Sequence, residues 1–220
     1  MKRLTTQLLT TLLVTLVCSA SYSQLLHRAN RPIEIDEVLW LQLSDEPQHH
    51  MYDADRDFRE GNRAGAVQNI RKTIVFLRVD AANASDSARN GLEVAADDLQ
   101  SMAHRLENGT EVRAVDLESA FSRVQHAIAE NHCACAKESW GHKRIQQAGY
   151  RMRAAGAAIE RSAKWSGTEL DAGVQASVED ARRVGATMVE DKDYAVDEIG
   201  KGLTSLGNGI ASLGHRIERK

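Results

Sequence analysis

Proline, aromatic residues and cysteine are all scarce in this chain of 220 residues. It contains two prolines, Pro32 and Pro47, and aromatic side chains make up only 5% of it. The alternating β-branched runs that are typical of strands are missing from the sequence, whereas alanine, arginine and the acidic residues are abundant. Because these residues favour helix and few prolines interrupt them, the sequence predicts an all-α protein.

Cysteine is too rare for a disulfide framework. The three cysteines are Cys18, Cys133 and Cys135, and the first lies in an N-terminal segment that we expect to be removed. On a helix, Cys133 and Cys135 would point about 200° apart, so a bond between them would require the helix to break. We therefore expect each of the two to be a free thiol, a metal ligand or one half of an intermolecular bridge.

Long apolar runs are confined to the N-terminus. The first 23 residues resemble a secretory signal peptide, with two basic residues, a largely apolar run over 8–17 and then small residues. A membrane span needs about 20 apolar residues, which is more than this run provides. Cleavage is expected after Ser23, with Ala20 as the alternative. Lipid anchoring at Cys18 is not expected, because the residues before it fit the lipoprotein pattern poorly. The sequence thus predicts export, to the periplasm or the exterior, and no transmembrane segment in the mature chain.

Basic residues do not dominate the charge. The formal net charge is −3 at pH 7, and it becomes −5 without residues 1–23, which contain two basic residues and no acidic one. A nucleic-acid-binding domain is expected to have a basic face. We therefore expect no nucleic-acid partner.

An internal repeat is the main positive feature of the sequence. Shifted by 82 residues, the sequence aligns apolar positions with apolar positions without gaps, as when Ile70 falls on Met152. Each copy predicts three helices. They cover about 34–59, 63–82 and 87–107 in the first copy, and about 115–140, 144–165 and 169–190 in the second. Pro47 should break the first of these helices, with Ser44 or Asp45 as the cap of a fresh start.

The last segment repeats only the first helix of a copy. It has a heptad stripe of Ile199, Leu203, Leu206, Ile210, Leu213 and Ile217. Its glycines would each cost about 1 kcal/mol relative to alanine, so close packing against another helix is expected. Docking on its own bundle is the main hypothesis, and the alternatives are self-association and a weakly ordered or lipid-touching helix.

The predicted fold is therefore an all-α helical bundle or short α-solenoid of about seven helices. It consists of two three-helix repeats and a terminal helix. The expected organisation is a signal peptide (1–23), a linker (24–33), the first repeat (34–109), the second repeat (110–191) and a C-terminal half-repeat (192–220).

Histidine and cysteine gather in the first helix of the second repeat. His132 and Cys135 are three residues apart, so on a helix they share a face and could chelate one ion. Imidazole and thiolate suit copper or zinc. The repeat places His50 on His132 and Asp53 on Cys135, and a metal site of His50, Asp53, His132 and Cys135 follows if the two helices pack side by side. The competing hypotheses are simple core packing and thiol redox chemistry.

Catalytic motifs are not recognisable in the sequence, so an enzyme is the least favoured class. Helical repeats expose extended faces that bind other proteins. The sequence therefore predicts an exported, non-enzymatic scaffold or binding protein that acts through protein–protein contacts in the cell envelope and has no cofactor. Its partners would be other proteins, or a second copy bound through the C-terminal helix. The alternative function is the binding or buffering of copper or zinc.

Overall fold

Seven α-helices make up the part of the chain that the structure, a computed structural model, describes: residues 45–190 and 195–218. They are α3 (Glu46–Arg59), α4 (Arg63–Asn83), α5 (Asp86–Glu107), α6 (Ala114–Gly141), α7 (Ile145–Ser166), α8 (Ala172–Val189) and α9 (Val196–Ile217). No strand occurs among these residues, so the predicted all-α class is confirmed. None of these seven helices is both long and apolar enough to cross a membrane. The predicted signal peptide, the linker and the segment 34–44 lie outside the described residues.

Helix ends follow from local chemistry. Asp45 is the N-cap of α3, and Pro47 lies in the first turn, where its missing N–H removes no helical hydrogen bond. The start of α3 after Asp45 agrees with the predicted cap there, and the predicted helix before Pro47 lies outside the described residues. α7 is followed by Gly167, whose φ of 58° is the left-handed conformation that often ends a helix. α8 begins later than predicted, because the Asp171 carboxylate caps it by accepting a hydrogen bond of 2.9 Å from the N–H of Val174.

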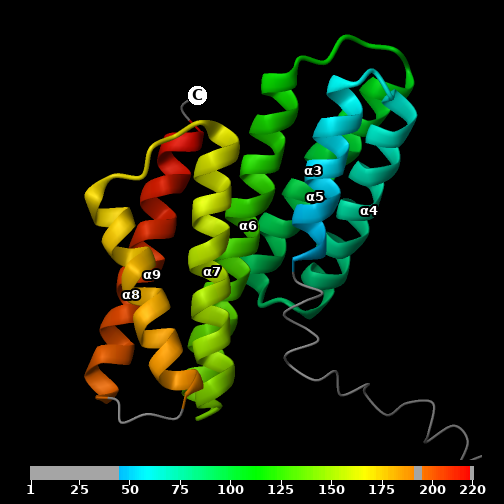
Figure 1. The fold of residues 1–220 in the computed structure, drawn as a ribbon. Coiled ribbons are helices and arrows are strands. Elements are labelled where there is room, and N and C mark those ends of the chain that lie inside the picture. The colour runs from blue at the N-terminus through cyan, green and yellow to red at the C-terminus, as the bar shows by residue number, and fades with distance from the viewer. Residues whose placement is uncertain (1–44, 191–194, 219–220) are drawn as a thin grey trace, which may run out of the picture. The chain divides into compact units, whose positions relative to one another are not determined.

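Every described residue lies in one compact unit, Glu37–Lys220. Within this unit, α6 belongs to two groups of helices. In the first group α3, α4 and α5 pack in order, and α6 closes the group by contacting both α5 and α3. In the second group α7, α8 and α9 pack in order, and α6 contacts α7 and α9. Consecutive helices run in opposite directions (Figure 1). The predicted bundle is therefore two four-helix arrangements that share α6.

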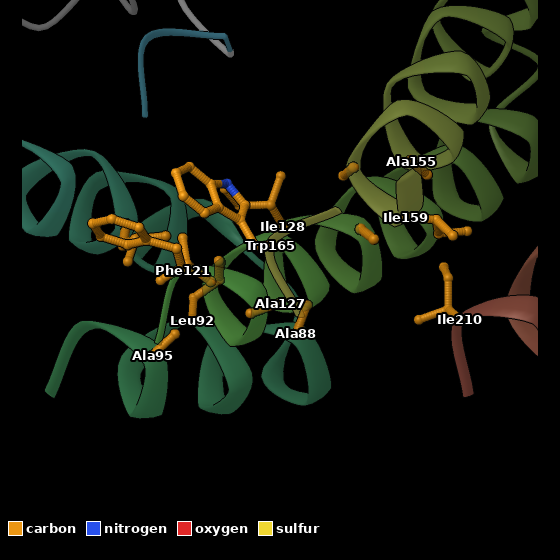
Figure 2. Close-up of a cluster of buried hydrophobic side chains, with 14 of the residues drawn as sticks. Ala88, Leu92, Ala95, Phe121, Ala127, Ile128, Ala155, Ile159, Trp165 and Ile210 are labelled. Carbon is orange, nitrogen blue, oxygen red and sulfur yellow. The ribbon is translucent and has the colours of Figure 1, made fainter. Parts of the chain in front are cut away.

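Because both groups of helices pack against α6, this helix is buried on several sides. Neighbouring residues of a helix point about 100° apart, yet the consecutive residues 127–129 and 131–133 are each at most 4% exposed. Figure 2 shows Phe121 of α6 beside Trp165 of α7, with Leu92 of α5 nearby. The ring centroids of Phe121 and Trp165 are 5.0 Å apart in an edge-on arrangement. The core is thus continuous from one group to the other through α6.

The C-terminal helix α9 docks on its own bundle, as predicted. It contacts α6, α7 and α8. Five of the six residues of its heptad stripe are at most 5% exposed, and the sixth, Ile217, is partly buried against the core. A Cβ atom at Gly202, Gly209 or Gly214 would lie only 2.7–3.2 Å from a side-chain atom of another helix. Glycine at these positions therefore allows the close approach of α9.

Candidate functional site

The two predicted ligands on α3 make separate, local contacts. His50 Nε2 lies 3.8 Å from the Glu46 carboxylate, and its ring centroid lies 5.8 Å from that of Phe76 on α4. The pKa of His50 is lowered, chiefly because burial disfavours the charged form of the imidazole. The Asp53 carboxylate is 2.9 Å from the guanidinium of Arg56. Each of the two ligands therefore interacts with a neighbour on its own helix.

His132 of α6 lies against an arginine. Its side chain is 1% exposed, and its Nδ1 atom is 3.4 Å from Nη1 of Arg151 on α7. An arginine can only donate, so Nδ1 accepts and the ring is neutral with its proton on Nε2. Burial, followed by the charge of Arg151, lowers the pKa of His132 to about 3. A metal cation at this nitrogen would be repelled by the fixed positive charge of the guanidinium.

Cys135 is half-buried, and Cys133 is the deeper of the two thiols. The Cys135 thiol donates to Oδ1 of Asn131, one turn earlier, over 3.7 Å. Burial raises the pKa of both thiols, so both stay protonated at neutral pH. Core packing, one of the competing hypotheses, thus describes Cys133 better than Cys135.

The structure does not bring the four predicted metal ligands together. Across residues 45–190 and 195–218, no group of three or more His, Cys, Asp or Glu side chains could hold a metal ion. The helices α3 and α6 do pack against each other, as the metal hypothesis requires. However, His50 packs on Phe76 of α4, whereas His132 contacts Arg151 of α7.

His132 and Cys135 instead take part in a polar cluster with Arg151 and Asp80 of α4. Burial raises the pKa of Asp80 to about 6, against the opposing effect of the Arg151 charge. The charges of Arg151 and Asp80 also act on the Cys135 thiol. The sequence gives only a weak signal for Asp80, which follows the core residue Leu77 by three positions. With a neutral imidazole and protonated thiols, the cluster offers no thiolate at neutral pH, where the Asp80 carboxylate is mostly ionised.

An open groove of about 790 Å³, which we call the first groove, lies between α4 and α5. Its deepest lining residues, Val67 and Leu106, are at most 5% exposed, while Val75 at its side is 61% exposed. Charged side chains of Arg63, Arg71, Lys72 and Glu107 complete the lining. Arg71 pairs with Glu107 at 2.6 Å, whereas within the described residues no ion pair involves Arg63 or Lys72.

A second groove, of about 540 Å³, lies between α7 and α8. Four of its lining residues follow lining residues of the first groove by 82 positions: Tyr150, Arg153, Ala154 and Ala157 correspond to Gln68, Arg71, Lys72 and Val75. The carboxylate of Asp45, at the start of α3, lies in this groove and pairs with Arg161 at 2.8 Å. Arg161 also donates to the buried amide of Gln125, which donates in turn to Gln48 of α3.

Comparison with known proteins gives no match to this chain, whether among protein-family models, curated proteins or solved structures.

Proposed function

We propose that this chain is an exported, non-enzymatic helical scaffold or binding protein that acts through protein–protein contacts in the cell envelope. The first groove carries the proposal, because it combines an apolar lining with an exposed valine, Val75, and with two cations that make no ion pair in the described residues. Apolar surface rimmed by polar side chains is characteristic of interaction sites. The support for export is the N-terminal sequence.

Internal duplication is part of the same proposal. The offset of 82 residues that aligns the two halves of the sequence also separates the starts of α4 and α7, at Arg63 and Ile145. The same offset relates the lining of the two grooves. A duplicated unit repeats its surface features together with its helices. Two grooves of related chemistry on one chain are therefore expected.

Photocrosslinking in the producing cell tests the proposal. The photoreactive residue benzoylphenylalanine replaces Val75 in the full chain, and Val94 of α5 is the matched control position. Val94 is 55% exposed but does not line the first groove. We expect discrete protein adducts in the envelope fraction from position 75 and none from position 94. Equal adducts at both positions, or none, would contradict the binding role, and a chain retained in the cytoplasm would contradict export.

A further inference from the structure

The geometry and charge of the first groove point to a defined kind of occupant. We propose that this groove binds an acidic amphipathic helix of a partner protein. This inference rests on the proposed function and specifies the chemistry of the partner.

The lining of the first groove follows α4 for several turns, with apolar residues toward both ends and Arg71 and Lys72 between them. Ala64, Val67 and Val75 line the groove from the side of α4, and the 11 steps along the helix from Ala64 to Val75 rise about 16 Å. That distance corresponds to about three helical turns. Leu106 provides apolar surface from α5. A docked helix with apolar residues at i, i+4 and i+7 would place one anchor per turn along this strip, as in other helix-in-groove complexes.

The charge of the groove is opposite in sign to that of the chain. Three basic residues and one acidic residue line it, a formal sum of +2, whereas the whole chain has a net charge of −3. Glu107 already neutralises Arg71, whereas Arg63 and Lys72 make no ion pair in the described residues, and Lys72 donates to the neutral amide of Asn69 over 3.3 Å. Carboxylates flanking the apolar anchors of a helix would complement them. Two basic residues without an ion pair are too few to bind the phosphate backbone of a nucleic acid, which typically requires several basic contacts.

The second groove shows the same chemistry inside this molecule. There the carboxylate is that of Asp45, which the N-terminal end of α3 brings to Arg161. Arg153, the counterpart of Arg71 in the first groove, lines the same space. In this second groove, a basic lining residue thus already pairs with an acidic residue from another helix end.

Selection from a peptide library tests the inference. The full chain, Val75→Glu and Val94→Glu are each used to select from a displayed library of random peptides of about 16 residues, long enough for four turns. We expect the full chain and Val94→Glu to retain acidic peptides with apolar residues at i, i+4 and i+7. Val75→Glu should weaken the binding of these peptides at least about tenfold, since it places a like charge at the docking surface. Lys72→Glu should weaken it as well, with the helix content of each variant checked by circular dichroism.

Other outcomes overturn the inference in distinguishable ways. If the retained peptides are basic, or lack the apolar spacing, while Val75→Glu still abolishes their binding, the partner chemistry is wrong and the protein-binding role survives. If no peptide distinguishes the full chain from Val75→Glu, the binding role of the groove fails as well. If sedimentation velocity shows that the full chain self-associates and that Val75→Glu is a monomer, a second copy is the occupant.

Discussion

The crossing of α7 and α8 depends on two glycines in direct backbone contact. A Cβ atom on Gly149 would lie 2.6 Å from the carbonyl oxygen of Gly185 and 2.8 Å from Cβ of Met188. A Cβ atom on Gly185 would likewise lie 2.6 Å from the carbonyl oxygen of Gly149. Backbone atoms cannot rotate out of the way as a flexible side chain can. Gly149→Ala must therefore push the two helices apart.

The size of the effect follows from two opposing contributions. Overpacking a well-packed interior costs about 1–3 kcal/mol, and replacing a helical glycine by alanine returns about 1 kcal/mol. Gly149→Ala should therefore destabilise the protein by up to about 2 kcal/mol. Gly156, on the same helix, is the matched control, because a Cβ there would meet Val178 and Ala181 at the ordinary distances of 3.6 and 3.7 Å. Gly156→Ala should instead stabilise the protein by about 1 kcal/mol.

Thermal unfolding followed by circular dichroism measures both changes. For a chain of this size, 1 kcal/mol corresponds to a shift of about 2–4 °C in melting temperature. Gly149→Ala should thus melt up to about 8 °C below the parent chain, and Gly156→Ala about 2–4 °C above it. If Gly149→Ala melts at or above the parent temperature, or if both variants shift in the same direction, the close crossing of α7 and α8 is wrong.

Three further outcomes are expected. Leu206→Ala, on the fully buried stripe of α9, should lower the free energy of unfolding in urea by about 2–5 kcal/mol, and an unchanged value would mean that α9 is not docked. The raised pKa of Asp80, about 6, makes stability fall as pH rises from about 4 to 6, whereas the lowered pKa of His132, about 3, makes stability rise with pH over the same window. On acidification from pH 6 to pH 4, Asp80→Asn should therefore lose about 3 kcal/mol more stability than the parent chain, and equal losses in the two would refute this opposition. Zn(II) or Cu(I) should leave the melting temperature unchanged. A bound ion at a hundredfold excess over its Kd would raise the free energy of unfolding by about 2.7 kcal/mol, and such an increase would restore the metal hypothesis.

Sequence periodicity predicts helices well because it is a local property. The bounds of α4 and α7 lie within one residue of the predicted ones, and the stripe of α9 was identified residue by residue. Periodicity assigns one buried stripe to each helix, however, and α6 is buried on several sides. The burial of Gln125 and Cys133 arises because two groups of helices meet on α6. That meeting is a tertiary contact, and no local pattern in the sequence encodes it.

The proposed duplication explains why the four predicted metal ligands do not lie together. A repeat places equivalent residues in equivalent surroundings, and it does not bring them to a shared point. His50 contacts α4, the second helix of its own proposed repeat, as His132 contacts α7, the second helix of the other. A shared site would need both side chains to turn toward the contact between α3 and α6. The two grooves follow the same pattern, because one lies within each proposed repeat, between its second and third helices. If the duplication is real, equivalence between positions 82 residues apart is a guide to features that occur twice, such as these grooves, and a poor guide to a site built once from both copies.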